Sequence, residues 1–385
     1  MVRKKRCLLA ITGAFALDGG IAVANRLAIY ALSSAGYQID LIAFNEIGAS
    51  KKAYEVFTNI TYQTARLSKP RFALLIWQRL ISRRYDLVFC DHVNLASLIA
   101  PLAMIGVTQY MVRLNGIEVF SPKPDVQGML GLHWAARRLA ISEYTKQQVL
   151  RSFPSLDVRT VELGLDPERT KRLSESVPMR SGTHVVELTA LDGNRYRLEG
   201  SVVLHVGRMA SGEQYKGQDV LIEAMPQILA QHEKAQLVLV GHGDDMPRLM
   251  MLVHAQSPTV QSRIFMPGFV SDNQLEQLYQ SCALFAMPSR GEGFGFVYIE
   301  AMCWGKPCIA SHMDAAQYIV QHERTGLLVE DATNPALVAE AVLMLLNNPN
   351  LAAQYGQASF EEVKAKYTFE QFCNRFLPAV QALSL

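Results

Sequence analysis

Short apolar runs alternate with amphipathic helical stretches along most of the chain. The first run, RCLLAIT (6–12), is followed by a helical pattern over 21–36 and then by a second run, YQIDLIAFN (37–45). Apolar runs of this length, bounded by turn residues, are typical of buried strands. A strand, a helix and a second strand in this order predict a β-α-β unit and therefore a parallel sheet.

The same alternation continues through both halves of the chain. Nearly continuous apolar strands fit a parallel sheet that helices cover on both faces. Because 385 residues exceed one ordinary core, we predict an α/β fold with two doubly wound, Rossmann-like domains facing a central cleft. The last amphipathic stretch, 368–383, is expected to return to the first domain. Further strands are expected at 85–91, 108–116, 137–142, 201–209, 235–245, 262–270, 282–289 and 306–311, and further helices at 217–232, 273–281 and 296–305.

Charge separates the two halves. Residues 1–180 hold 24 Lys and Arg against 14 Asp and Glu, whereas the remaining residues hold 13 and 21, a net charge of −8. The change falls in a polar stretch where DGN (192–194) is typical of a hairpin turn. We therefore predict an N-terminal domain over 1–180, a C-terminal domain over 181–365 and a returning helix over 366–385.

Composition argues against several classes of protein. No run of about 18 apolar residues occurs, so the pattern predicts no membrane-spanning helix. Six scattered cysteines without a CxxC pair are typical of reduced, mostly buried thiols. The start MVRKKR followed by an apolar run also resembles a signal peptide, but the run is short and a helix follows at once, which favours a first strand.

Two cations are expected to meet at the end of one strand. Arg208 follows the strand SVVLHV, and Lys216 lies just before the helix that begins near residue 217. An Arg fork and a Lys point charge suit a diphosphate, and a helix N-terminus adds partial positive charge. Two solvated surface cations are the alternative.

The stretch SRGEGFGFVYIE (289–300) joins an expected strand to an expected helix. Its glycines allow the backbone to approach a ligand closely. Glu292 would lie in the loop, where a polyol can be hydrogen-bonded. Glu300 would lie in the helix and lean back toward the same end, where its carboxylate suits the two hydroxyls of a ribose. A capping loop with two surface glutamates is the alternative.

These residues resemble motifs of retaining glycosyltransferases with the GT-B fold, family 4 in particular. Glu292 and Glu300 are similar to the E-x7-E motif, and GRM…YKG (207–217) is similar to the Arg/Lys pair. The resemblance extends over nearly the whole chain. The second-domain motifs are highly specific together and include VGHGDD (240–245), PGFVSD (267–272) and GLLVED (326–331). The first-domain motifs are weaker: DGG (18–20), DHVNL (91–95), NGIE (115–118) and ISEYTKQQV (141–149).

The resemblance implies a role for each matching residue. Arg208 and Lys216 would hold the donor diphosphate, Glu292 the hydroxyls of the donor sugar, and Glu300 the ribose. It further implies retention of anomeric configuration without a metal or other cofactor, and we find no DxD-type metal pair in a suitable loop. The rest of the donor site would comprise the backbone of Gly293, Phe294 and Gly295, Val270 in GFVSD (268–272) beside the base, and Gly19 and Gly20 in the first-domain loop.

Asp244 and Asp245 follow GHG and are expected to cap a helix instead of holding a metal. In the first domain, His92 just past a strand is expected to polarise the acceptor hydroxyl or to bind sugar or phosphate, with a structural histidine as the alternative. Asn115 stands where many relatives carry His, so hydrogen bonding is its expected role. Glu118 would contact the acceptor or cap a helix.

The basic first domain includes SKPRFALLIWQRLISRRYD (68–86). A cationic helix with an apolar face is expected to lie on an anionic membrane, and an ordinary helix packed on its sheet is the alternative. No aromatic-basic module points to nucleic acid. The cations are Lys69, Arg71, Arg79, Arg83 and Arg84, and the apolar residues are Phe72, Leu75, Ile76, Trp77 and Leu80.

The sequence therefore predicts an acceptor-binding N-terminal domain and a nucleotide-sugar-binding C-terminal domain. The expected activity is metal-independent, retaining transfer of a mannose- or glucose-type hexose, from GDP-mannose first or a UDP-hexose second. The expected acceptor is a glycan or a polyprenyl-pyrophosphate-linked saccharide in surface polysaccharide assembly, such as lipopolysaccharide or exopolysaccharide. The expected location is the cytoplasm, peripheral to the inner face of the plasma membrane. The alternatives are a nucleotide-sugar-binding protein without transferase activity and a Rossmann dehydrogenase, whose GxGxxG spacing the first loop lacks.

Overall fold

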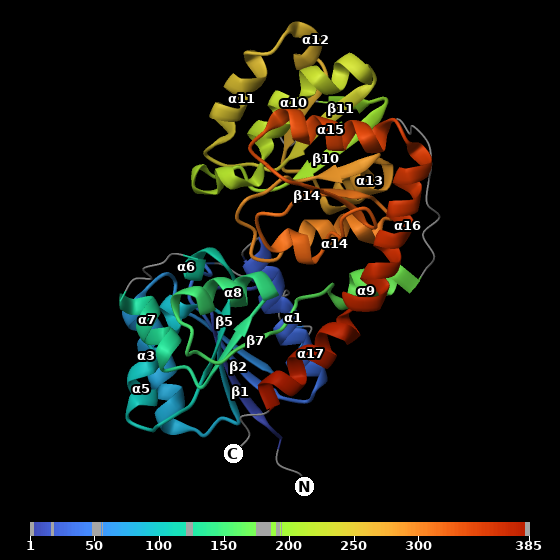
Figure 1. Cartoon of the computed structure of the whole chain (residues 1–385). Coiled ribbons are helices and arrows are strands. Elements are labelled where there is room, and N and C mark those ends of the chain that lie inside the picture. Colours follow the sequence, from blue (N-terminus) through green and yellow to red (C-terminus); the bar gives the residue numbers. More distant parts are fainter. Residues whose placement is uncertain are drawn as a thin grey trace. The chain divides into compact units, whose positions relative to one another are not determined.

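The computed structural model of the protein describes residues 4–16, 19–47, 55, 57–120, 126–174, 186–189, 193 and 195–381. The chain forms two compact units: Met1–Pro167 with Thr368–Leu385, and Glu168–Tyr367. Each unit is built on a parallel sheet with helices around it, so the predicted α/β class with two parallel-sheet domains is confirmed (Figure 1). The first unit ends at Pro167, earlier than residue 180, and Arg172 in α9 (Pro167–Ser174) pairs with Glu276 within the second unit.

The first unit is a seven-stranded sheet in the order β3-β2-β1-β4-β5-β6-β7, with every neighbouring pair parallel. The order reverses between β1 and β4, and such a switch point is where open α/β sheets bind ligands. Its strands are β1 (Arg6–Ile11), β2 (Gln38–Ala43), β3 (Ile60–Thr64), β4 (Leu87–Cys90), β5 (Met111–Leu114), β6 (Arg137–Ala140) and β7 (Val158–Thr160). Its helices are α1 (Gly20–Ser34), α3 (Lys69–Ser82), α4 (Val93–Ala96), α5 (Ala100–Met104), α6 (Ile117–Phe120), α7 (Val126–His133) and α8 (Glu143–Ser152).

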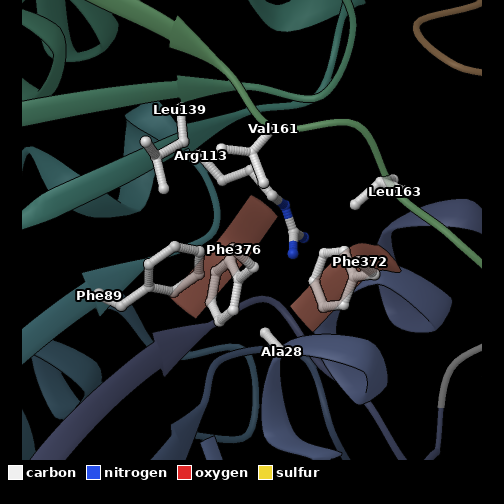
Figure 2. A pocket seen from close by; sticks show the side chains of 8 residues that line it. All are labelled: Ala28, Phe89, Arg113, Leu139, Val161, Leu163, Phe372 and Phe376. Atoms are coloured by element: carbon white, nitrogen blue, oxygen red, sulfur yellow. The ribbon is translucent and has the colours of Figure 1, made fainter. Parts of the chain in front are cut away.

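The last helix, α17 (Phe369–Gln381), packs on the first unit as predicted. Phe376 meets Phe89 of β4 edge to face at 5.9 Å between ring centroids. Arg375 donates to the carbonyl of Glu162 at 3.3 Å. The two phenylalanines line a small apolar cavity into which the Arg113 guanidinium points (Figure 2). The helix therefore supplies core that the preceding chain of this unit lacks.

The second unit is a six-stranded parallel sheet in the order β12-β11-β10-β13-β14-β15. Its strands are β10 (Ser201–Val206), β11 (Ala235–Val240), β12 (Ile264–Gly268), β13 (Leu284–Ala286), β14 (Cys308–Ser311) and β15 (Gly326–Val329). Its helices after α9 are η1 (Ser211–Lys216), α10 (Gln218–Gln231), α11 (Met246–His254), α12 (Pro258–Gln261), α13 (Asp272–Ser281), α14 (Phe296–Cys303), η2 (Ala315–Tyr318), α15 (Pro335–Leu346) and α16 (Pro349–Lys366).

An antiparallel hairpin, β8 (Val186–Thr189) with β9 (Arg195–Leu198), precedes this sheet. The DGN sequence predicted such a hairpin, although Asp192 and Asn194 lie outside the described residues. Sequence reasoning missed β3, β7 and β15. The first two are short edge strands with few fully buried positions, and edge strands carry a weak apolar signal.

The predicted membrane face of α3 is wrong for most of its residues. Phe72, Ile76 and Leu80 are buried in the core of the first unit, because they form the face that packs on the sheet. Two of the cations, Arg79 and Arg83, approach Asp40 of β2 at 3.9 Å and 3.5 Å. The helix is therefore first of all an ordinary sheet-covering helix.

Within the described ranges, no single helix has the length and apolar character to cross a membrane. One pair, Pro335–Leu346 with Pro349–Gln381, passes that test only in combination and is bent by 94°. No disulfide joins the six cysteines, all of which the structure describes.

Candidate active site

The loop between β13 and α14 has a shape that glycine permits. Gly295 immediately precedes α14 and has a φ of 100°, and a Cβ there would lie 2.6 Å from the buried ring of Tyr298. A Cβ on Gly291 would lie 3.0 Å from the ring of Tyr215. The first position needs a residue without a Cβ because the left-handed region and the close contact coincide. The loop thereby carries Glu292 at the carboxyl end of the sheet.

The backbone and the carboxylate of Glu292 are both held by neighbouring residues. Its backbone N–H donates to Asp314 at 2.8 Å, and its carbonyl accepts from the N–H of Ala315 at 3.2 Å. Its carboxylate forms an ion pair with Lys216, and only 15% of the side chain is exposed. The carboxylate therefore has a defined position and is not a freely solvated surface group.

Four charged side chains form one cluster: Arg208, Glu213, Lys216 and Glu292. Lys216 pairs with Glu292 and lies 3.6 Å from Glu213, while Arg208 binds the other oxygen of Glu213. Burial by itself would lower the pKa of Lys216, but the two carboxylates outweigh it and raise that pKa above its ordinary value. The two cations thus lie together, as their spacing predicted, with Glu213 between them.

His205 and Gly207, at the carboxyl end of β10, lie next to Lys216 of this cluster. The fully buried ring of His205 bonds the carbonyl of Ala286 through Nδ1 at 3.1 Å, and Nε2 has no hydrogen-bond partner among the described residues. A Cβ on Gly207 would lie 3.1 Å from that Nε2 and 3.2 Å from Cδ of Lys216. Burial lowers the pKa of His205 to about 3, so the ring is neutral. The glycine lets the Lys216 stem pass close to the strand end.

Asp314 is a buried carboxylate directly behind Glu292. It accepts from Ser289 Oγ at 2.6 Å, from Glu292 N at 2.8 Å and from Ala316 N at 2.9 Å. Burial raises the pKa of Asp314 to about 6, and the charge of Glu292 adds to this, while the three hydrogen bonds act in the opposite direction.

Glu300 lies in α14 and makes its own set of contacts. Its carboxylate pairs with Arg169 of α9 and accepts from the hydroxyl of Tyr279 at 3.1 Å. Burial, followed by the Glu300 charge, raises the pKa of that tyrosine well above its ordinary value, so the hydroxyl remains a donor. Glu300 and Glu292 therefore occupy separate small networks in the same unit.

The remaining predicted donor residues have few recorded contacts. The side chain of Phe294 is buried between Phe296 and Tyr367, at 5.3 Å and 6.2 Å, so only its backbone can meet a ligand. Val270 follows β12 next to Phe269, whose half-exposed ring stacks on His242 at 5.8 Å. Their roles, and that of Gly293, stay predictions.

The expected capping role of Asp245 is wrong. It occupies the position before α11 but makes no capping hydrogen bond, because its carboxylate binds Arg248 and Gln214 instead. Asp244 accepts from Ser211 N at 2.8 Å and fixes the start of η1. Across the described residues, no group of three His, Cys, Asp or Glu side chains could hold a metal ion.

In the first unit, a buried polar network lies at the ends of β1, β4 and β5. Asp91 accepts from Thr12 N at 2.9 Å and from Asn25 Nδ2 at 2.7 Å. Arg113 donates to Asn25 at 2.7 Å and to Asn115 at 2.8 Å. Burial lowers the pKa of Arg113, and Asp91 partly offsets this. Asn115 also donates from Nδ2 to the carbonyl of Asp91 at 2.6 Å and is thus a member of this network.

The other predicted first-unit residues border the network. Glu118, in the first turn of α6, accepts from the backbone N–H of Asn115 at 2.5 Å. His92 precedes α4, and its Nδ1 accepts from Asn94 N at 3.2 Å, which leaves Nε2 for other contacts. Gly19, with a φ of 107°, precedes α1, and Gly20 is its first residue.

Sequence reasoning missed four residues that shape these sites: Glu213, Asp314, Arg169 and Tyr279. Glu213 carried a signal, because it lies in the same loop as Lys216. The others carried none, since each reaches its partner only through the fold: Arg169 meets Glu300 across 131 positions of sequence.

Comparisons with known proteins place these motifs in context. Residues 200–348 match the family model of glycosyl transferases group 1. The chain is 30% identical over 293 residues to a GDP-mannose-dependent alpha-(1-6)-phosphatidylinositol monomannoside mannosyltransferase of Mycobacterium tuberculosis, covering 71% of this chain and 70% of the relative. It is 25% identical over 379 residues to an uncharacterized glycosyltransferase of Methanocaldococcus jannaschii, covering 91% of each.

Solved structures share the fold over nearly the full length. Sucrose-phosphate synthase from Thermosynechococcus elongatus has a TM-score of 0.77 at 22% identity and covers 99% of both chains. Anabaena HepE in complex with UDP and glucose has a TM-score of 0.73 at 18% identity, covering 99% of this chain and 100% of that one.

Proposed function

The chain belongs to the glycosyl transferases group 1, and from this premise we propose that its second unit binds a nucleotide sugar and transfers the hexose with retention of configuration. The observation that carries the proposal is the cluster of Arg208, Glu213, Lys216 and Glu292 at the carboxyl ends of parallel strands. A diphosphate would take over the two cations from Glu213, which now shares them. Glu292 would then be free to bind the hydroxyls of the donor sugar.

In the proposed reaction the two cations stabilise the charge that develops on the departing diphosphate. Lys216 stays protonated and positively charged for this purpose, because its pKa lies above its ordinary value. The acceptor hydroxyl attacks on the face that the leaving group vacates, which retains the anomeric configuration. The positive charge comes from side chains, so we propose that turnover needs no metal and survives a chelator.

We propose GDP-mannose as the donor and a UDP-hexose as the second candidate. The mycobacterial relative is named as GDP-mannose-dependent, and the HepE structure holds UDP and glucose. Glu300, already bonded to Tyr279 and Arg169, is the proposed ribose ligand, since a carboxylate accepts from two neighbouring hydroxyls. Val270 is proposed to lie beside the base, and the backbone of Gly293 and Gly295 beside sugar and phosphate.

The first unit is proposed to bind the acceptor. His92 is the residue proposed to contact the acceptor hydroxyl or the sugar, because its Nε2 is not used by the Asn94 contact. Asn115 and Glu118 are proposed to act by hydrogen bonding, and Gly19 and Gly20 to let the backbone approach the donor phosphates. The proposed acceptor is a lipid-linked saccharide of surface polysaccharide assembly. The name of the mycobacterial relative, which specifies a phosphatidylinositol monomannoside, supports a lipid-linked acceptor.

Peripheral contact with an anionic membrane is also proposed, through a surface that differs from the predicted one. Leu74, Trp77 and Ile81 recur along one side of α3 and are exposed, as are Met104 and Ile105 at the end of α5. Trp77 Nε1 donates to the carbonyl of Leu98, just before α5, at 2.7 Å, which ties α3 to the segment that leads into α5. Neighbouring cations would complement acidic headgroups.

Vesicle sedimentation tests this contact. Ile81→Glu with Ile105→Glu should release the protein from vesicles of phosphatidylglycerol and phosphatidylcholine. Met344→Glu, at an exposed apolar position of the second unit, is the matched control and should bind as the wild type does. Sedimentation of the double variant at the wild-type level would disprove the membrane surface.

The donor site is tested in two steps. First, the Tm of the protein is measured in a chelator with GDP-mannose, UDP-glucose or NAD. One nucleotide sugar should raise the Tm, and NAD should not. Second, release of nucleoside diphosphate is measured with a polyprenyl-pyrophosphate-linked monosaccharide as acceptor. Glu292→Gln should abolish it, while Glu330→Gln, at a highly exposed position, should not. A thermal shift without turnover by the wild type would favour the alternative, a nucleotide-sugar-binding protein without transferase activity.

A further inference from the structure

Asp314 joins two loops that are far apart in sequence, the one after β13 and the one after β14. We propose that Asp314 in its ionised form is the positioning residue for Glu292, so that its protonation releases the loop and switches turnover off in mild acid. The effect on turnover rests on the proposed function, whereas the effect on the loop does not.

The geometry is that of a clamp around one residue. Asp314 accepts from the N–H of Glu292, and the next residue, Ala315, donates to the carbonyl of Glu292. The same carboxylate also accepts hydrogen bonds from Ser289 Oγ and Ala316 N. Both backbone groups of Glu292 are therefore fixed by two consecutive residues, and within the described part of the chain neither group has another hydrogen bond.

The neutral form of Asp314 fits this arrangement less well than the ionised form. Ser289 Oγ and Glu292 N both donate to Oδ2, and Ala316 N donates to Oδ1, so a proton on either oxygen competes with a donor. On Oδ2 the proton can be donated to Ser289 Oγ, whose own hydroxyl can turn to Tyr298 at 3.3 Å, but that oxygen is then a poorer acceptor for the N–H of Glu292. The contact most directly tied to function is the one to Glu292.

The surroundings place this titration near neutrality. The titratable groups that face Asp314 are Glu292 from the same loop, Tyr298 from α14 and Tyr215 from η1, with Lys216 of η1 beyond Glu292. Burial raises the pKa of Asp314 to about 6, and the negative Glu292 adds to the rise. Ser289 acts against it by donating to the ionised form.

The pH dependence of kcat in two variants tests whether Asp314 positions Glu292. Wild-type kcat should fall about tenfold per pH unit below pH 6, following the ionised fraction, with KM for the donor little changed. Asp314→Asn should have a low kcat, reduced at least about tenfold at pH 7.5, that no longer varies between pH 5 and 7.5. Asp331→Asn is the matched control, because Asp331 accepts from Thr333 in an exposed loop, with the charge of Arg290 as its link to the loop of Glu292, and it should keep the wild-type profile.

Ser289→Ala provides a second test that keeps the carboxylate. It removes a hydrogen bond that favours the ionised form, so the acidic fall of kcat should move to higher pH. If Asp314→Asn does not fold, Ser289→Ala still tests whether ionised Asp314 positions Glu292. An acidic limb that stays at the wild-type position in Ser289→Ala would overturn the proposal, as would an Asp314→Asn variant with wild-type kcat and profile.

Hydrogen exchange separates this inference from the proposed function. The amides of residues 289–296, corrected for intrinsic rates, should exchange faster in Asp314→Asn than in Asp331→Asn, and faster in the wild type at pH 5 than at pH 7.5. Absence of turnover in the wild type would then refute the transferase and leave the clamp supported. Equal exchange in all three proteins refutes the clamp whatever the activity.

Discussion

Lys216→Met compared with Arg208→Met isolates the effect of burial on one ion cluster. Both variants remove one positive charge that contacts Glu213. The Lys216 side chain is 12% exposed and the Arg208 side chain is 62% exposed. Loss of Lys216 leaves Glu292 and Glu213 close together without their shared cation, whereas loss of Arg208 leaves Lys216 in place to pair with both.

The losses in free energy of unfolding caused by Lys216→Met and Arg208→Met should differ several-fold. Breaking a buried ion pair by removing one partner costs about 3–5 kcal/mol, and slight exposure places Lys216→Met near the lower end, at about 3 kcal/mol. An exposed pair is worth about 0.2–1 kcal/mol, so Arg208→Met should cost no more than that. In a domain of about 200 residues, each kcal/mol lowers Tm by roughly 2–4 °C, which predicts a loss of roughly 6–12 °C against roughly 4 °C or less.

Differential scanning calorimetry at pH 7.5 in low salt measures both shifts. The double variant Lys216→Met with Glu292→Gln removes the unpaired carboxylate as well, and it should recover part of the loss because the two sites are in contact. Equal shifts for Lys216→Met and Arg208→Met would refute the argument from burial. A double variant no more stable than Lys216→Met alone would show that the Lys216–Glu292 pair is not the stabilising contact.

Three further outcomes follow from the same structure. Gly217→Ala should destabilise the second unit by more than about 1 kcal/mol, since its φ is 80° and a Cβ would lie 2.5 Å from the carbonyl of Pro288, while Gly212→Ala, with open space around it, should be neutral in thermal unfolding. Tyr279→Phe removes the donor to Glu300 and should raise KM for the nucleotide sugar by about three- to tenfold with kcat retained, and an unchanged KM would contradict the ribose assignment. The pKa of Asp314 is raised in the folded state from an ordinary 3.8 to about 6, so the folded protein binds the extra proton in that window. Its stability should therefore fall by about 2–3 kcal/mol as pH rises from about 4 to 6, relative to Asp314→Asn, and parallel Tm–pH curves for the two proteins would contradict this.

The fold was largely predictable because parallel strands are buried on both faces. Strands such as Leu87–Cys90 are apolar without interruption, and that pattern survives whatever lies beside them. The edge strand Ile60–Thr64 mixes polar and apolar residues and has no such signature. The apolar residues of α3 illustrate a different limit, since a helix with one apolar face does not reveal whether that face meets a sheet or a membrane.

The site was predictable where its residues share a loop or a helix. Gly207, Arg208 and Lys216 lie within one strand–loop–helix passage, so their proximity follows from local geometry. Asp314 reaches Glu292 from another loop because β14 pairs with β13, and Arg169 reaches Glu300 of α14 from α9. Contacts of this kind have no local sequence pattern.

The return of α17 has a consequence for biosynthesis. The second unit is one continuous segment inserted into the first, whose core is completed by residues that follow the insertion. A ribosome has therefore synthesised every residue of the inserted segment before Phe372 and Phe376 can cover Phe89 and Ala28. The inserted segment can begin to fold before α17 has been made, but the first unit can close only after α17 has left the ribosome. A nonsense mutation just before the codon of Phe372 thus leaves the first unit open, exposing its apolar interior to chaperones and proteases.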